Sequence, residues 1–378
     1  MENIPETHTD IDRALFDKLP LQGQSSSLSS MVTATVPGVT ADSDGLFHGL
    51  GDHASNQFSL DGQPITDQQS KVFSNQIPVD AVQSVEVIEG APPAEYGDKT
   101  SLVIAVTTRS GLGTKPAHGD ITASYGTFGT SNEDINLAVG GNKAGNFISL
   151  SGLNTGRFLD SPELAVIHDH GNEENLFDRV DFKPTQGDTL SANLSFTRPG
   201  SRLPTRTTRR MRQRGRDPIA RYSGTPPCAM DWGRTGRTVG STDQRSQIRT
   251  FNVAPTWTRV VDQNTVFTFG GFARQDQYYY YPSANPFADV VPDLTLETVG
   301  QHRTLTDLGL RTNVAYAKGI HNLKIGATYS DTIVTERDDI GLLVPEQSDV
   351  YHFYGHANIR ELALFAQDTS ASSDSHSI

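Results

Sequence analysis

Long hydrophobic runs are absent from this chain of 378 residues, of which only 35% are hydrophobic. The longest relevant run, Leu102–Val106, has five residues, whereas a membrane-spanning helix needs about 20. The sequence therefore excludes a membrane-spanning helix. It does not exclude a transmembrane β-barrel, because barrel strands carry apolar residues only at every second position.

Cysteine is almost absent as well, and so is a recognisable leader. The single cysteine, Cys228, excludes an internal disulfide and gives no indication of the redox compartment. The first residues, MENIPETHTDIDR, lack the basic and apolar regions of a signal peptide. For an exported protein we therefore expect that the start of the sequence has been lost.

Positive charge is scarce outside one segment. The net charge is −13, yet residues 198–237 contain eleven arginines, two aspartates and no lysine or glutamate. The rest of the chain carries 20 basic and 42 acidic residues, a net charge of −22. Such an acidic body argues against a nucleic-acid binder. The arginine-rich segment, residues 198–240, leaves three interpretations: an irregular surface loop, an anion-binding loop, or the product of a frameshift.

Two apolar runs near residue 100 have the composition of strands. Val85–Ile88 and Leu102–Val106 flank a reversal at Gly90 and a turn at Tyr96-Gly97. We predict that the runs pair as strands and bury their apolar side chains, each worth roughly 1.5–3 kcal/mol when fully buried. Upstream, a short helix with Leu28 on its buried face should precede them.

These motifs resemble the plug domain of TonB-dependent outer-membrane receptors. The family pattern "V-x-x-I-E-V-I-x-G-x-x-x-x-x-Y-G", followed by a short strand ending in Thr-Thr-Arg, is matched over Val82–Arg109. LDGQPITDQ, at Leu60–Gln68, matches a second family strand and turn. The motif residues are Asp61, Gly62, Glu86, Gly90, Tyr96 and Gly97. The stretches FHGLGDHASNQFSLDGQPITDQQSKVFSNQIP and ELALFAQD further resemble the Oar-like branch.

The resemblance implies energised import of a bulky nutrient, such as a siderophore or an oligosaccharide, across the outer membrane. It also implies two partners, a TonB-type energy-transducing protein and outer-membrane lipid, and no cofactor. No convincing TonB box occurs in Met1–Arg13, so coupling cannot be assigned to residues.

After Gly111 the hydrophobic pattern changes to a period of two, which is typical of half-buried strands. It is clearest where Leu190, Ala192, Leu194 and Phe196 alternate with polar residues. We predict ten strands, near residues 119–127, 133–140, 145–155, 176–184, 189–198, 249–261, 264–276, 304–317, 321–335 and 360–367.

The connections between these strands alternate between short and long, apart from the brief link at residues 128–132. We expect long connections at residues 156–175, 199–248, 277–303 and 336–359. Short turns at one end and long loops at the other are typical of outer-membrane barrels. Because plugged transporters have about 22 strands, ten strands predict a fragment with an open sheet and an exposed edge near Glu361–Gln367.

Few residues suggest a binding or catalytic site. Tyr278, Tyr279 and Tyr280 end a strand on the long-loop side, where they fit either an interfacial aromatic girdle or a ligand platform. The histidines at 168, 170, 352 and 356 could bind metal, but their context favours solvated loops. No supported arrangement of catalytic residues occurs, which favours transport over catalysis.

The sequence as a whole predicts an α+β plug domain followed by a partial antiparallel transmembrane β-barrel. We expect a linker remnant at residues 1–10, the plug at 11–111 and the first part of the barrel at 112–378. The predicted function is that of a TonB-dependent receptor. A β-rich surface adhesion module without transport is the alternative, and a metal-dependent hydrolase would depend on the histidines alone.

Overall fold

The computed structural model describes residues 7–16, 18, 24–42, 46–49, 56–65, 77–90, 92–97, 102–159, 168–202, 243–283, 297–344 and 347–370. Residues 203–240 of the arginine-rich segment lie outside these ranges, so the three interpretations of it stay predictions. Within the described part of the chain, no helix is both long and apolar enough to cross a membrane.

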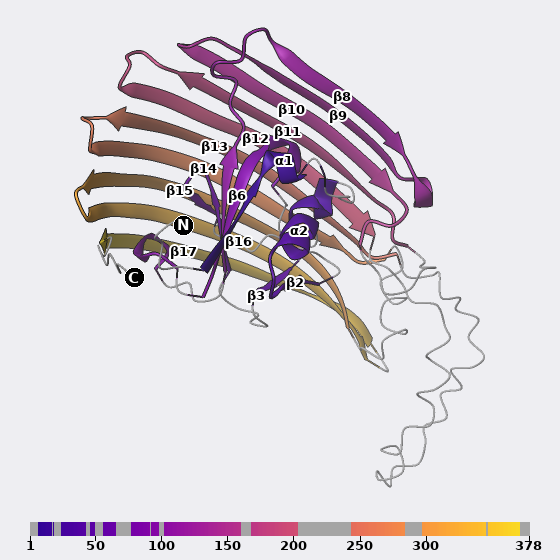
Figure 1. The fold of residues 1–378 in the computed structure, drawn as a ribbon. Helices are drawn as coiled ribbons and strands as arrows, with labels where there is room; N and C mark the ends of the chain where they lie inside the picture. Colours follow the sequence, from indigo (N-terminus) through magenta and orange to yellow (C-terminus); the bar gives the residue numbers. More distant parts are fainter. Residues whose placement is uncertain are drawn as a thin grey trace, which may run out of the picture.

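The N-terminal part folds as a small sheet covered by a helix, as predicted for the plug (Figure 1). Its sheet has the order β1-β6-β7-β4-β5, with β4 and β7 parallel and the other neighbours antiparallel. The strands are β1 (Thr7–Asp12), β4 (Asn56–Leu60), β5 (Gln63–Ile65), β6 (Val82–Glu89) and β7 (Leu102–Thr108). The remaining elements are α1 (Arg13–Phe16), α2 (Gln24–Thr35), β2 (Val39–Ala41), β3 (Phe47–Gly49), and the 3₁₀ turns η1 (Val79–Ala81) and η2 (Ala94–Tyr96).

The two apolar runs pair as predicted, because their β-branched residues point alternately into one core. Val85 lies opposite Val106 and Val87 opposite Ile104, and all four are at most 2% exposed. Leu28 of α2 packs into the same cluster of buried residues. The plug therefore has a dry, apolar centre of the kind found in water-soluble domains.

One boundary needs correction. Residues 7–10, which the sequence analysis placed in a linker, belong to β1, and His8 lies opposite Ile88 of β6. The segment THTDID has a single apolar residue, Ile11, so it lacks an apolar alternation. It is nevertheless held as a strand because β6 offers a free edge with backbone groups to pair.

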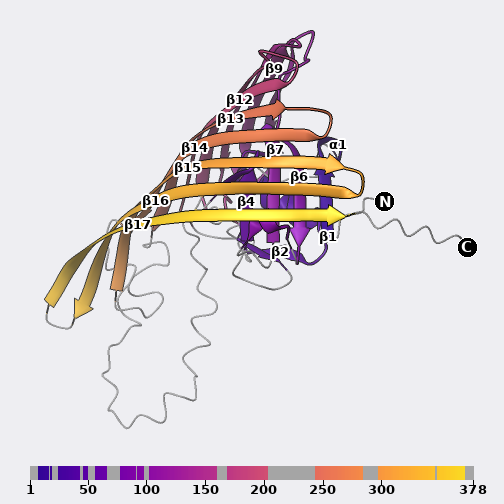
Figure 2. The same cartoon turned by 90° about the vertical axis from the view of Figure 1, so that its left-hand side faces the viewer.

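The C-terminal part is one ten-stranded antiparallel sheet in which each strand pairs with its sequence neighbours (Figures 1 and 2). Its strands are β8 (His118–Tyr125), β9 (Ser131–Gly140), β10 (Ala144–Thr155), β11 (Gly171–Phe182), β12 (Asp188–Arg202), β13 (Arg245–Val260), β14 (Thr265–Tyr281), β15 (Glu297–Lys318), β16 (His321–Val344) and β17 (Gln347–Ser370). A 3₁₀ turn, η3 (Thr127–Gly129), follows β8. The two edge strands, β8 and β17, are not paired with each other, so the sheet is curved but open, as predicted.

The last strands are longer than predicted. Residues 336–359 were expected to form a loop, but β16 extends to Val344 and β17 begins at Gln347. Residues 277–281 and 297–303 of the expected loop 277–303 likewise belong to β14 and β15. Charged residues such as Arg337 and Asp339 broke the hydrophobic alternation here, yet cross-strand pairing continues through them.

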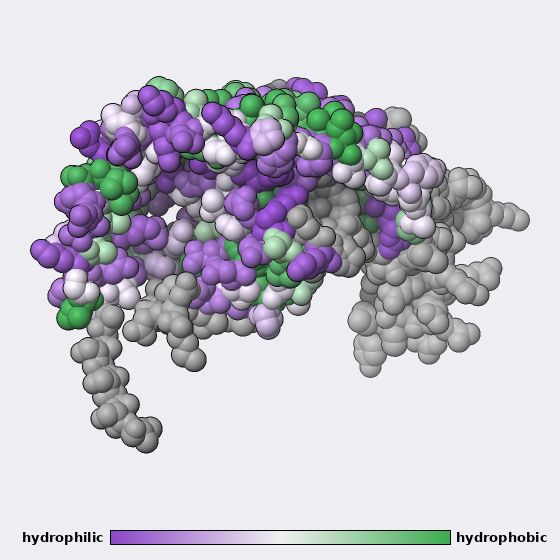
Figure 3. Space-filling model, turned by 45° about the horizontal axis from the view of Figure 1, so that its top comes forward, coloured by the Kyte–Doolittle hydropathy of each residue, from purple (hydrophilic) through white to green (hydrophobic). Residues whose placement is uncertain are grey.

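The two faces of this sheet differ in polarity. On β12, Leu190, Leu194 and Phe196 point outward and are 36–44% exposed, whereas Asn193 and Thr197 point inward and are at most 4% exposed. Figure 3 shows hydrophobic side chains, in green, over the outer surface of the sheet. A sandwich would bury these apolar residues between two sheets, so the arrangement contradicts the adhesion-module alternative and is typical of a membrane barrel wall.

The plug lies within the curve of the sheet, against the polar inner wall (Figure 2). One small apolar contact joins the two parts, where Ala81 of η1 packs with Ala138, Phe147 and Phe177 of the wall. Arg109, directly after β7, places its guanidinium 4.3 Å from the ring centre of Phe147. Most other contacts between plug and wall are polar, and they define the candidate site.

Candidate functional site: the contact between plug and barrel wall

The site begins at the tight turn between β4 and β5. Asp61 and Gly62 form this turn with φ values of 48° and 79°, the left-handed region that an Asp-Gly pair tolerates best. A Cβ atom on Gly62 would lie 2.1 Å from Nη1 of Arg311, so a side chain here would displace the guanidinium from the turn, in addition to the strain of the positive φ. This explains why the LDGQPI motif carries these two residue types.

The Asp61 carboxylate joins the plug to two strands of the wall. It accepts hydrogen bonds from the backbone nitrogen of Thr108 at 2.9 Å and from its hydroxyl at 2.6 Å. From the wall, Asn193 donates its amide at 2.5 Å and Arg179 approaches at 3.4 Å. Thr108 belongs to the plug strand β7, so Asp61 ties β7, β11 and β12 together.

The backbone and neighbours of the same turn reach two further strands. Nη2 of Arg311, on β15, donates to the Asp61 carbonyl at 2.5 Å and to Thr256 of β13 at 3.1 Å. Next to the turn, the Gln63 amide donates to Oδ1 of Asn252 at 2.7 Å, and both side chains are at most 1% exposed. Four wall strands thus converge on one hairpin, which we call the Asp61 anchor.

A second carboxylate extends the anchor along the wall. Asp181 is fully buried and accepts hydrogen bonds from Ser110, after the plug strand β7, and from Ser191 of β12, each at 2.5 Å. It also pairs with Arg179 at 3.1 Å. Arg179 therefore lies between Asp61 and Asp181, so one cation serves two carboxylates.

The other end of the plug contacts the last strands of the sheet. Lys324 of β16 pairs with Glu95 of η2 at 2.5 Å, and Gln367 of β17 accepts a hydrogen bond from the Ala94 nitrogen at 2.8 Å. These two contacts hold η2 against the inner wall. Lys324 is 38% exposed and Glu95 25%, compared with 17% for Arg179 and 20% for Asp61 in the anchor.

The remaining motif residues lie around η2. Burial raises the pKa of the Tyr96 phenol above its usual range, and the nearby carboxylates of Glu95 and Glu86 act in the same direction. Burial, followed by the charge of Asp10 on the paired strand, raises the pKa of Glu86. Gly90 has a φ of 84° at the end of β6, where the chain reverses.

The structure thus brings together only some of the six plug-motif residues. Asp61 and Gly62 lie in the anchor, whereas Glu86, Gly90, Tyr96 and Gly97 lie around η2 and β6. Sequence reasoning missed the wall residues Arg179, Asn193, Asn252 and Arg311. Their one signal was polarity at the inward positions of otherwise alternating strands, which says nothing about which plug residue they meet.

The candidate tyrosines are divided between the two faces of β14. Tyr278 is 4% exposed and lies on the inner face, with the Arg303 guanidinium 5.9 Å from its ring centre. Tyr279 lies on the outer face, stacked on His302 at 4.2 Å and on Tyr281 at 6.0 Å between ring centres. Tyr280, two residues from Tyr278, shares its side of the strand.

The histidines do not assemble a metal site. His352, for example, bonds Asp339 of the neighbouring strand through Nδ1. Within the described ranges, no group of three or more His, Cys, Asp or Glu residues could hold a metal ion.

Comparisons with known proteins agree with this geometry. Residues 2–101 match the family model of the TonB-dependent receptor plug domain. No curated protein matches the chain. The fold resembles FpvA of P. aeruginosa, solved with pyoverdines (12% identity, TM-score 0.65, 98% of this chain and 50% of that one). It also resembles the ferric citrate transporter FecA (15%, 0.66, 98% and 55%) and the siderophore receptor PiuA from Acinetobacter baumannii (11%, 0.66, 96% and 55%).

At these identities the solved structures show the fold alone, and the chain spans about half the length of each of them. Residues 2–101 therefore carry the plug domain of that family, and the fold of the described residues is that of a receptor plug with part of its barrel sheet. Its described residues form a plug-like domain followed by a sheet of ten strands, as in part of a barrel.

Proposed function

We propose that this chain forms the plug and part of the barrel of an outer-membrane receptor that imports a bulky nutrient. The observation that carries the proposal is the seating of a separately cored plug on the polar face of a sheet whose other face is apolar. Such a wall is suited to lipid outside and water inside, and the plug occupies the water side.

Within this proposal, the inner face of β14, near the C-terminal end of the strand, contributes to ligand binding. Tyr278 and Arg303 lie on the inner face towards the end where β10, β12 and β14 lead into connections of 15 or more residues. Long loops mark the outside of the cell in bacterial barrels. An aromatic face beside a guanidinium suits an anionic or aromatic ligand, because both stacking and charge pairing are offered.

The Asp61 anchor would hold the plug closed until transport. The Asp61 and Arg179 side chains are only 20% and 17% exposed, so moving this part of the plug requires breaking several partly buried, charge-assisted hydrogen bonds together. Such bonds each contribute about 1.5–3 kcal/mol. The summed free energy of these bonds is large enough that moving the plug requires an external source of energy. Supplying that energy is the role proposed here for a TonB-type partner.

Ferric siderophores are the first ligands to test. The solved structures compared above are of FpvA bound to pyoverdines, of a ferric citrate transporter and of a siderophore receptor. Oligosaccharides are the second class of ligand to test. Membership of the Oar-like branch stays a prediction.

The test is a gene deletion in the native host, complemented with the intact gene or with a Tyr278→Ala, Arg303→Gln variant. Uptake of radiolabelled iron from a panel of ferric siderophores is measured, in parallel with uptake of labelled oligosaccharides. We expect one ligand to lose uptake on deletion and on removal of the TonB-type protein. The double variant should weaken uptake of that ligand at least tenfold.

A matched control is Tyr279→Ala, which removes a neighbouring ring from the outer face and should leave uptake unchanged. Loss of no ligand on deletion, or uptake that is independent of the energy-transducing protein, would contradict the proposed function. Equal loss in both tyrosine variants would contradict the assignment of the ligand to the inner face.

A further inference from the structure

The outer face of the sheet carries a cluster of arginines at the long-loop end. Because side chains alternate along a strand, Arg198 and Arg202 of β12 point outward with Leu194 and Phe196. On β13, Arg245 and Arg249 point outward with Phe251. The two strands are neighbours, so four guanidiniums share one surface, which we call the outer arginine cluster.

The register sets two of these charges directly opposite each other. Arg202 pairs with Arg245 across β12 and β13. Like charges at opposite positions destabilise a sheet, because their side chains are about 5 Å apart at Cβ. Asp243 lies 3.4 Å from Arg202 and offsets one of the two charges. Arg245 has no hydrogen bond or ion pair from its side chain within the described residues.

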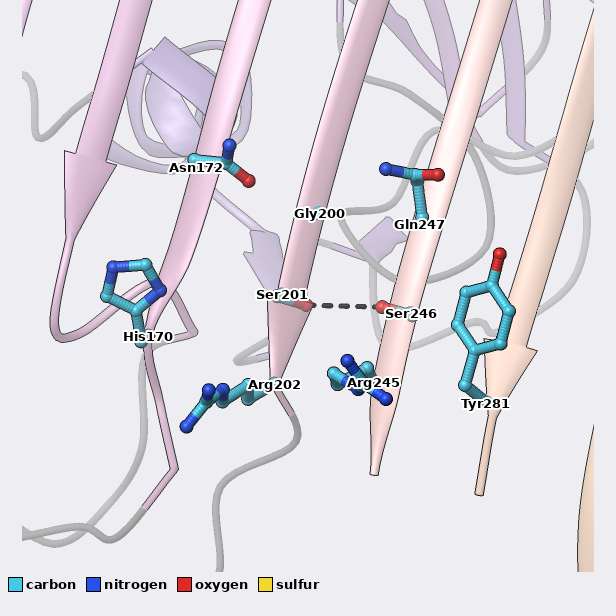
Figure 4. Close-up of a pocket in the computed structure, with 9 residues that line it drawn as sticks. All are labelled: His170, Asn172, Gly200, Ser201, Arg202, Arg245, Ser246, Gln247 and Tyr281. Carbon is cyan, nitrogen blue, oxygen red and sulfur yellow. Dashed lines mark hydrogen bonds between the residues drawn. The ribbon is translucent and has the colours of Figure 1, made fainter. Parts of the chain in front are cut away.

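A cavity of about 220 Å³ lies at this pair (Figure 4). Arg202, Arg245 and His170 line it, together with Tyr281 and the amides of Asn172 and Gln247. Gly200 also lines it, and a Cβ there would lie 3.3 Å from Oδ1 of Asn172. The lining offers cations and neutral hydrogen-bond donors with no carboxylate among its residues, which suits a phosphate-sized anion.

The position of the cavity along the strands can be compared with the end of the apolar band on the outer face. The outward residues of β12 are apolar up to Phe196 and basic from Arg198, and those of β13 change between Phe251 and Arg249. Phe196 and Phe251 are register partners, so the apolar band ends at one level. The Arg202–Arg245 pair lies six residues further, roughly 20 Å along strands tilted by about 40°, or about 15 Å in height.

Aromatic residues mark the same end of the outer face. Tyr279 and Tyr281 stack on each other, and the Arg249 guanidinium lies 5.7 Å from the Tyr279 ring centre. Tyrosines of this kind anchor barrels at the membrane–water interface. Tyr281 is the register partner of Arg245 and lines the cavity. An anion held there therefore lies on the outer face at the level of this girdle, where lipid headgroups lie, and not in the lumen.

We infer that the outer arginine cluster binds the phosphorylated headgroup of an outer-leaflet glycolipid, lipopolysaccharide by its chemistry. The inference depends on the proposed function only through the membrane location of the sheet. A phosphate between Arg202 and Arg245 would replace their repulsion by two charge-assisted contacts. The acyl chains of the same lipid would lie along Phe196 and Phe251.

The test measures binding of bisphosphorylated lipid A to the whole chain in non-ionic detergent, by native mass spectrometry. Arg202→Gln with Arg245→Gln should weaken binding at least tenfold. Gly200→Val, which fills the cavity without changing charge, should also weaken it several-fold. Arg259→Gln is the matched control, because Arg259 lies on the same outer face of β13 at the opposite end of the strand.

Retained binding in both cavity variants would overturn the inference. So would an equal loss in Arg259→Gln, which would show general charge attraction. Inorganic phosphate that competes at the concentration of the lipid would show a free-anion site and would overturn it too. The variant Arg202→Lys with Arg245→Lys keeps the charge, and we expect intermediate binding with unchanged thermal stability.

Binding in micelles requires no transport. A chain that binds lipid A but imports no ligand would therefore leave this inference standing while contradicting the proposed function. A chain that imports a ligand but binds no lipid A would contradict this inference and leave the proposed function standing.

Discussion

In the plug sheet, Val85, Val87, Ile104 and Val106 are at most 2% exposed and face one another. In the barrel sheet, Leu190, Leu308 and Leu310 are 44–52% exposed, while Asn193 and Ser195 on the inner face of β12 and Asp307 on that of β15 are at most 8% exposed. Both sheets use strands with alternating faces, but each directs its apolar face to a different medium. Alternation alone therefore gives a sheet one apolar and one polar face. The medium around the sheet decides which of the two faces is turned towards the interior of the molecule.

The largest expected effect comes from opening a cavity in the plug. Ile104→Ala should lower the free energy of unfolding of the plug by about 2–5 kcal/mol, because a fully buried side chain is truncated. Protease resistance of the plug in a denaturant series measures this. Leu310→Ala, at an exposed position of the outer wall, is the control and should leave plug resistance unchanged.

A charge on the outer face should be costly only in lipid. Leu310→Arg should destabilise the sheet by about 2–4 kcal/mol in a bilayer if the residue lies near the midplane. The inward neighbour Asn313→Arg should be tolerated better, since it faces the polar side. Unfolding in lipid vesicles, compared with unfolding in detergent, separates the two. An equal loss of stability in lipid at both positions would contradict the assignment of the two faces to different media.

Weakening the Asp61 anchor should loosen the contact between the plug and the barrel wall without changing the stability of either sheet. Asp61→Asn removes the charge that meets Arg179 and should cost about 1.5–3 kcal/mol. Cleavage of the plug by added protease should accelerate, while heat resistance of the barrel sheet stays the same. Asp120→Asn, whose carboxylate bonds only Asn136 of the wall, provides the control. A plug released equally by both variants would argue against a specific anchor.

The aromatic girdle should make a smaller contribution. Tyr279→Ala removes stacking on His302 and Tyr281, worth about 0.5–1.5 kcal/mol per aromatic pair beyond area burial. Unfolding in vesicles should show the loss, and the difference should shrink in detergent, where no fixed interface exists. The size of the loss should not depend on whether the ligand is present.

The smallest effect concerns Glu86 and depends on pH. Its pKa is raised in the folded plug by burial and by Asp10, so the folded state holds the proton more tightly than the unfolded state. The contribution of the group is therefore most favourable below its unfolded pKa, near 4.5, and is lost as pH rises through the folded value. Glu86→Gln should thus be more stable than the wild type at pH 7 and similar to it at pH 4. A stability difference that does not change with pH would contradict this account.

The sequence predicted the fold well where residues alternate. The runs at Val85–Ile88 and Leu102–Val106 could be paired because their burial depends on local pattern and a short reversal. The ten barrel strands followed from the same reasoning. The ends of β16 and β17 could not be found, because hydrogen bonding to neighbours carries these strands through charged residues.

The candidate site was less predictable. Asp61 and Gly62 could be identified from the turn that they form, since an Asp-Gly pair suits positive φ values. Their partner Arg311 lies 250 residues away in sequence, and no local pattern specifies a contact of that separation. The division of Tyr278 and Tyr279 between faces depends on strand register, which adjacent tyrosines do not reveal.

The apolar face of the ten-stranded sheet should contact lipid, while the polar face contacts the plug. Nitroxide labels placed singly at residues 190–197 of β12, in a chain with Cys228→Ser, test it most directly. In membranes, collision with oxygen should peak at Leu190, Ala192, Leu194 and Phe196, and motion should be restricted at Asn193 and Ser195. Equal accessibility at all eight positions, or oxygen maxima at Asn193 and Ser195, would contradict the account.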